Sequence, residues 1–184
     1  MPKLLFLCIL LGAPLAGVGQ ETRGGYLGGS IGFLGHDFDG PVVSVDVISE
    51  SLGAYGGYRL NDHFAVELGY TAALDLGFAE VEPDVGTEGS TELNLLTASV
   101  TGFAPIGGGL WELLGGGGLF VAGGSVKRDF LFGQTLAEKV DDKGLWVLLG
   151  AQRYFAKLVL RTGLELYDIE KSAWRLAVGI HFSL

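Results

Sequence analysis

The sequence is almost without cysteine. Cys8 is the only one among 184 residues, and it lies in a segment, residues 1–19, that we expect to be removed during export. The remaining 184 − 19 = 165 residues then contain no cysteine at all. Exported proteins can be stabilised by disulfides, and a mature chain without cysteine cannot form any.

The removed segment has the pattern of a secretory signal peptide. Lys3 precedes the apolar run Leu4 to Leu11, and the small residues Gly17 and Gly19 stand at positions −3 and −1 of a cleavage site before Gln20. Such a segment is too short to anchor a protein in a membrane. We therefore predict one domain over residues 20–184, exported through a cleaved signal peptide.

Positive charge is scarce. Lys and Arg number 12 against 21 Asp and Glu, which gives a net charge of −9, and Arg59 is the only basic residue between Arg23 and Lys127. Binding to phosphate backbones needs clustered positive charge, so nucleic acid is not an expected partner.

Long apolar runs are also missing from the mature chain. No stretch reaches the ~18 residues that a membrane-spanning helix needs, yet the mean hydropathy is +0.41 and the chain has 32 glycines. High hydropathy without a helical span is typical of a transmembrane β-barrel, in which apolar residues occupy alternate positions.

The clearest alternation is in the last eleven residues, Trp174 to Leu184. The even positions are large and apolar, whereas the odd positions are polar or small. Successive side chains of a strand point to opposite faces, so this stretch predicts a strand with one apolar face. A strand in this position needs partners on both edges, and closure against the first strand supplies them.

Seven further strands are predicted upstream of this one. The expected fold is therefore an all-β, eight-stranded antiparallel up-and-down transmembrane β-barrel. Residue 58 should pair with 66 across the turn at 61–63. The glycines 115–118 interrupt the fifth strand, and we attribute strand glycines to close packing around a tight barrel, or to a bend. The predicted strands are 25–34, 51–60, 64–73, 92–104, 110–122, 144–155, 157–167 and 174–184.

The predicted connections alternate in length. Turns at 61–63, 105–109 and around 156 are short, whereas the first three connections at the other end run to roughly 16–20 residues and the fourth, 168–173, to about six. Outer-membrane barrels have short periplasmic turns and longer outside loops.

The composition of the non-apolar strand face distinguishes a soluble barrel from a transmembrane one. A soluble lipocalin-like barrel would turn its apolar face inward around an apolar ligand. Here the other face is glycine, serine, threonine, alanine and tyrosine with isolated charges, and strands one to five hold one Arg and no Lys. This composition favours a narrow, self-filling lumen with the apolar face toward lipid.

Five charged residues fall on the predicted inner face, namely Arg59, Glu67, Arg161, Glu165 and Arg175. We expect a structural network of ion pairs, because charges removed from water are retained when they are paired and hydrogen-bonded. We also expect Glu165 to bridge Arg161 and Arg175. The alternative use of these charges is a proton or small-ion path.

His181 and Ser183 resemble the His/Ser pair of small outer-membrane barrels that deacylate lipid A, which raises the alternative of a lipid A-modifying enzyme. Both lie on the predicted inner face, near the end of the barrel away from the outer leaflet, and the strand offers no Asp or Glu to orient the histidine. We therefore expect no catalytic site. His36 and His63 would lie at opposite ends of the barrel, so we expect no metal site, and we expect no cofactor.

The first two long connections are acidic, with residues such as Asp37, Asp46, Glu80 and Glu82. They are either a solvated, repulsive surface or contacts to divalent cations in a lipopolysaccharide layer.

The mature chain resembles the OmpA/OmpX-like family of small outer-membrane β-barrels. The segments that carry the resemblance are 57–60 (Gly-Tyr-Arg-Leu), 66–70 (Val-Glu-Leu-Gly-Tyr) and 178–182 (Val-Gly-Ile-His-Phe), and Gly179, Phe182 and Leu184 are similar to the family's C-terminal assembly signal.

The resemblance implies a non-enzymatic integral protein of the bacterial outer membrane. It implies a structural, envelope-integrity or surface-interaction (adhesin-like) role. The expected partners are outer-membrane lipids, lipopolysaccharide and the barrel-assembly machinery, and we expect a monomer.

Overall fold

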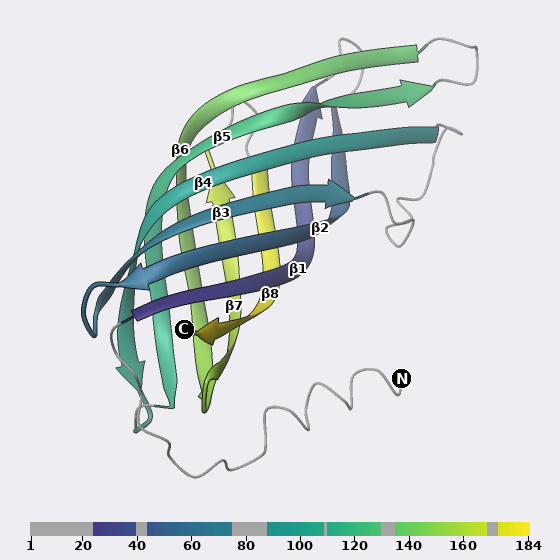
Figure 1. The fold of residues 1–184 in the computed structure, drawn as a ribbon. Helices are drawn as coiled ribbons and strands as arrows, with labels where there is room; N and C mark the ends of the chain where they lie inside the picture. The colour runs from purple at the N-terminus through teal and green to yellow at the C-terminus, as the bar shows by residue number, and fades with distance from the viewer. Residues whose placement is uncertain (1–23, 40–43, 75–87, 109, 130–134, 169–172) are drawn as a thin grey trace, which may run out of the picture.

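The computed structural model describes residues 24–39, 44–74, 88–108, 110–129, 135–168 and 173–184. These residues form one closed antiparallel barrel in which each strand pairs with its neighbours in the sequence (Figure 1). No helix among them is long and apolar enough to span a membrane. The strands are β1 Gly24–Asp39, β2 Ser44–Arg59, β3 Phe64–Leu74, β4 Glu88–Ile106, β5 Trp111–Asp129, β6 Thr135–Phe155, β7 Leu158–Tyr167 and β8 Ala173–Ser183.

The predicted eight strands and their closure are confirmed. β1 pairs with β8, with Leu27 opposite Phe182, and Tyr58 lies opposite Val66 as the turn length predicted. Closure gives both edges of the last strand a partner, which the alternating pattern of that strand required. The proposed signal peptide lies outside the described residues.

On the side of the long connections, the predicted ends of β1, β2, β4, β5 and β6 were wrong, whereas those of β3, β7 and β8 agree to within one residue. β5 and β6 remain paired from Trp111 opposite Arg153 as far as Asp129 opposite Thr135, and β1 and β2 remain paired as far as Asp39 opposite Ser44. Figure 1 shows β4, β5 and β6 running well past β7 and β8.

The prediction ended each strand where apolar alternation ended. Strand pairing depends on backbone hydrogen bonds and not on apolar side chains. Polar segments can therefore stay paired beyond the apolar band of the barrel. Most of the first and third stretches predicted as long connections is therefore strand. The stretches between these strands are 40–43, 75–87 and 130–134.

The two faces of the barrel are as predicted. On β8 the even positions are exposed, with Leu176 at 50 % and Phe182 at 52 %, whereas Arg175 and His181 are buried. The same outward exposure of large apolar side chains recurs on every strand, for example at Ile31, Leu68 and Leu149. A lipocalin-like arrangement, with this face inward, is excluded.

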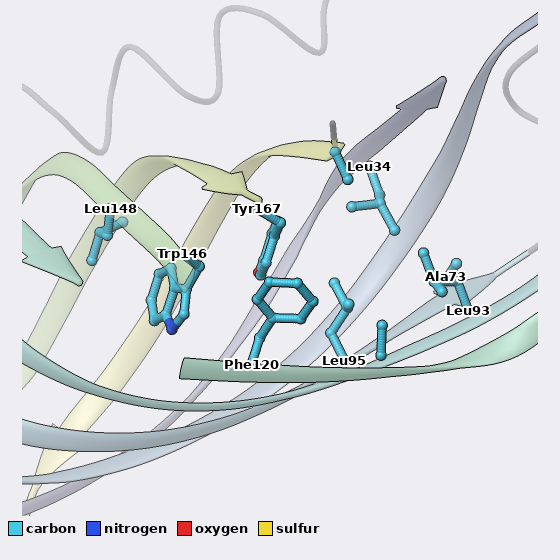
Figure 2. Packing of buried hydrophobic residues seen from close by; sticks show 10 residues of the cluster. Leu34, Ala73, Leu93, Leu95, Phe120, Trp146, Leu148 and Tyr167 are labelled. Carbon is cyan, nitrogen blue, oxygen red and sulfur yellow. The ribbon is translucent and has the colours of Figure 1, made fainter. Parts of the chain in front are cut away.

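The end of the interior opposite the short turns is filled by apolar side chains, which the sequence reading did not anticipate. The ring of Tyr167 lies between Phe120 and Trp146, with centroid distances of 5.5 Å and 5.9 Å (Figure 2). The prediction of a lumen lined by small and polar residues is therefore wrong for this end. The buried cluster comprises Leu34, Ala73, Leu93, Leu95, Phe120, Ala122, Trp146, Leu148, Tyr167 and Ala173.

The glycines of β5 differ in what surrounds them. A Cβ atom on Gly118 would overlap the carbonyl oxygen of Ala98 on β4, whereas a Cβ on Gly115 would have nothing within 4 Å. Close approach of the strands thus requires glycine at 118, as predicted for a tight barrel, but not at 115.

This difference yields a matched pair of substitutions. We expect Gly118→Ala to lower the free energy of unfolding by about 1–3 kcal/mol, the range for overpacking. Gly115→Ala should leave it unchanged or raise it by up to about 1 kcal/mol, because alanine restricts the unfolded chain. Guanidinium unfolding of the two variants in detergent micelles measures both changes, and equal losses would contradict the close approach.

Candidate functional site

Three ion pairs follow one another through the interior, from the short turns to the edge of the apolar cluster around Tyr167. Arg59 pairs with Glu112 at 3.0 Å, Arg161 with Glu67 at 2.7 Å, and Arg175 with Glu165 at 3.2 Å. All five sequence-predicted residues thus point into the barrel.

The pair nearest the short turns is held by a polar cage. Arg59 Nη2 donates to both carboxylate oxygens of Glu112, at 3.0 and 3.1 Å. Gln152 Nε2 and the Tyr154 hydroxyl donate to Glu112 Oε2, each at 2.8 Å. The Arg59 guanidinium carbon lies 4.0 Å from the centre of the Phe103 ring, within cation–π range. Glu112 is 1 % exposed at its side chain, so its charge depends on these donors.

The middle pair joins strands across the lumen. Arg161 on β7 donates from Nη1 and Nη2 to the two oxygens of Glu67 on β3, at 2.7 and 3.0 Å. The Tyr26 hydroxyl on β1 donates to the same carboxylate. This two-pronged arrangement is the strongest geometry that arginine and a carboxylate can form.

The third pair joins β7 to β8 and β8 to the first two strands. Arg175 Nη1 lies 3.2 and 3.3 Å from the Glu165 oxygens, and the Tyr167 hydroxyl donates to Glu165 at 2.6 Å. Arg175 also donates to Ser51 Oγ at 2.9 Å and to Ser30 Oγ at 2.7 Å. One guanidinium therefore crosslinks four strands.

The prediction that Glu165 bridges Arg161 and Arg175 was wrong. Glu165 pairs with Arg175, while Arg161 turns to Glu67. Residues four apart on a strand are about 13 Å from one another, and in an eight-stranded barrel side chains on opposite walls meet in the middle. A partner across the lumen is therefore nearer than one further along the same strand.

Glu112 was missed because the glycines 115–118 hide the alternation of β5. A signal was nevertheless present, since Glu112 is the only charged residue in the predicted strand 110–122. A lone carboxylate in an apolar strand can be placed only on the inner face.

Two small cavities lie inside the described part of the barrel. A cavity of about 50 Å³ lies between the middle and the third ion pair and is lined by Thr71, Thr97 and Trp146 among others. A second cavity of about 20 Å³ lies beside Tyr26 and Tyr154. A water needs roughly 10–15 Å³ measured in this way. These cavities can hold a few ordered waters and no larger solute.

His181 is fixed by aromatic residues. Its Nδ1 is 3.1 Å from the Tyr55 hydroxyl, and its ring lies 4.8 Å from that of Tyr26. His181 is 5 % exposed, and Ser183 follows it on the inner face. Within the described residues, no group of three or more His, Cys, Asp or Glu side chains is placed to hold a metal ion.

The outward face has an apolar band of defined height. Between the outward positions Lys143 and Arg153 of β6, the outward residues are Leu145, Val147, Leu149 and Ala151. Ten residues at ~3.3 Å each, tilted by roughly 40°, span about 25 Å along the barrel axis, the height of the lipid-facing band of outer-membrane barrels.

Aromatic rings mark the band's boundary near the short turns. The Arg153 guanidinium carbon lies 5.3 Å from the Trp111 ring centre and 5.0 Å from that of Phe155. Aromatic girdles of this kind flank the apolar band at both membrane interfaces.

The three residues of the predicted assembly signal lie on different faces of β8. Phe182 and Leu184 point outward and are 52 % and 80 % exposed. Gly179 faces inward, where an added Cβ would lie 2.8 Å from the carbonyl oxygen of Gly29.

Comparison with protein families finds a match to the outer membrane protein beta-barrel domain over residues 4–184. A comparison with curated proteins found no match.

Several solved structures share the fold. Neisserial surface protein A is 18 % identical with a TM-score of 0.59, and the match covers 87 % of this chain and 97 % of that one. The N-terminal barrel domain of Pseudomonas aeruginosa OprF is 15 % identical with a TM-score of 0.61, covering 88 % and 98 %. Yersinia pestis Ail, the attachment invasion locus protein, is 17 % identical with a TM-score of 0.53, covering 86 % and 99 %.

The middle pair provides a test of the charge network. Glu67→Leu leaves Arg161 buried without its carboxylate, and we expect the free energy of unfolding to fall by about 3–5 kcal/mol. The double variant Glu67→Leu/Arg161→Leu removes both charges and should recover most of that loss. Denaturant unfolding of both variants decides this, and a double variant as unstable as the single one would show that the charges are not coupled.

Proposed function

Because the chain belongs to the outer membrane protein beta-barrel domain family, we propose that it is a non-enzymatic integral protein of a bacterial outer membrane. Its role in this proposal is structural and surface-interacting, with the short turns in the periplasm and the extended strands outside. The observation that carries the proposal is the apolar outward band of about 25 Å, bounded on β6 by Lys143 and Arg153.

The extended strands support a surface role. In the part of the chain that the structure describes, β6 pairs with β7 only from Trp146 opposite Tyr167 onward, and Asp168 N donates to the carbonyl oxygen of Leu145. Residues 135–144 of β6 therefore pair with β5 alone. A free strand edge outside the membrane can add a strand from a partner protein. Its outward charges Lys139, Asp141 and Lys143 protect such an edge against nonspecific pairing.

The same proposal includes the partners expected from the sequence. Outer-membrane lipids and lipopolysaccharide would surround the apolar band, and the exposed Phe182 and Leu184 with Gly179 would be read by the barrel-assembly machinery. The sealed interior supports a monomer that needs no partner chain to complete its fold. Many of the acidic residues proposed to contact divalent cations, among them Glu80 and Glu82, lie outside the described residues.

Orientation and location can be tested together, because the predicted mature chain has no cysteine. We expect K143C to react with a membrane-impermeant thiol reagent on intact cells, and K157C to react only after the outer membrane is permeabilised. Both lysines are exposed. A soluble periplasmic protein would leave both variants unlabelled on intact cells, and an inverted barrel would exchange their behaviour.

The alternative of a lipid A-modifying enzyme makes a different prediction. His181 is buried inside the barrel against Tyr55 and Tyr26, so a lipid outside the wall does not reach it. We expect His181→Ala and Ser183→Ala to leave the mass spectrum of lipid A from expressing cells identical to that of the wild type. An acyl-chain difference that the wild-type protein produces and either variant abolishes would establish the enzyme.

A further inference from the structure

The outer wall is hollowed across β2, β3, β4 and β5. The hollow has a volume of about 630 Å³, within the range of roughly 300–1,000 Å³ that is typical of sites for small molecules. Its lining includes small residues at outward positions, Gly56, Ala98 and Gly117. Strand pairing places Leu68 between Gly56 and Ala98, and Leu119 beside Ala98. Other outward positions of the wall carry large side chains, for example Ile31 and Leu149.

The hollow lies within the apolar band. Gly56 is six positions from the outward Glu50 and four from Leu60, at the short turn. Ala98 is six positions from the outward Glu92. Six residues of a strand tilted by roughly 40° correspond to about 15 Å along the barrel axis. At this depth only hydrocarbon surrounds a barrel in a bilayer.

Two apolar partners could cover the hollow, a second copy of this protein or the hydrocarbon chain of a lipid, and the shape of the hollow favours the lipid. A symmetric dimer brings the same patch of both copies face to face, and two facing concave surfaces would leave a void. A flexible hydrocarbon chain can fill the same space, and the hollow is continuous with the apolar band on all of its strands. The outward side chains of the lining, Val66, Leu68, Val100 and Leu119 among them, carry no charge. Glu67 also contributes to the lining, but its side chain points into the lumen and pairs with Arg161.

The hollow is closer to the short turns than to the extended strands. Tyr58 lines it, two residues before the turn begins, and is 55 % exposed. Tyrosine is favoured where an apolar surface meets the polar membrane interface. A hydrocarbon chain in the hollow would therefore come from a lipid of the leaflet on the side of the short turns.

We propose that this hollow is a binding site for one acyl chain of a glycerophospholipid from the periplasmic leaflet. The inference rests on the proposed outer-membrane location. Bound in this way, the lipid completes the wall where Gly56, Ala98 and Gly117 leave it thin.

The test fills the hollow. Ala98→Phe, and the milder Ala98→Leu, place a side chain in the hollow, while Ala104→Phe makes the same change further along β4 at an exposed position outside it. Each protein is purified in mild detergent, titrated with palmitoyl-oleoyl phosphatidylethanolamine and analysed by native mass spectrometry. Heat-modifiable migration on gels confirms that each variant is a folded barrel.

We expect wild type and Ala104→Phe to retain one phospholipid, and both Ala98 variants to lose it, with affinity lowered about tenfold or more. Equal retention by all four proteins would mean nonspecific surface lipid and would overturn the inference. A dimer that Ala98→Phe abolishes would overturn it in favour of a second copy. Labelling of K143C and K157C reports separately on membrane location, so failure here leaves the proposed function standing.

Discussion

The structure depends on one constraint, namely that a strand within hydrocarbon must have its backbone hydrogen bonds satisfied on both edges. The pairing of β1 with β8 meets it by closing the sheet. Once the sheet is closed, side chains on one face are confined to a narrow interior and those on the other face the surroundings. The alternation along β8, with Leu176 outside and Arg175 inside, follows directly from this closure.

An eight-stranded interior is only as wide as the side chains that fill it. Charged side chains that enter it cannot be solvated by bulk water, so they must find one another. Arg161 reaches Glu67 on the facing wall, and Arg175 reaches Glu165 and two serines. The aromatic cluster around Tyr167 fills the other end, so the interior serves as a packed core and the outer wall is the surface available for interaction.

Much of this could be predicted from the sequence because alternation reports directly on the two faces of a strand. Strand number, closure, the register at Tyr58 and Val66, and the inward position of five charged residues all follow from period two. The partners of those charges could not be predicted, because the tilt and stagger of the strands determine which side chains face one another across the lumen. The strand ends were also missed, since a polar ladder outside the apolar band has no alternation to mark it. Glu112 escaped notice because four glycines leave its strand without a pattern.

The central claim is that the apolar face of the strands meets lipid. Spin labels at successive positions of β4 test it most directly, through their accessibility to oxygen, which concentrates in hydrocarbon, and to a water-soluble nickel complex. In reconstituted bilayers, labels at the outward positions of Leu96, Ala98 and Val100 should be accessible to oxygen and protected from nickel. Labels at the inward positions of Thr97 and Ser99 should be protected from both. Nickel-accessible labels at 96, 98 and 100 would place that face in water and contradict the account.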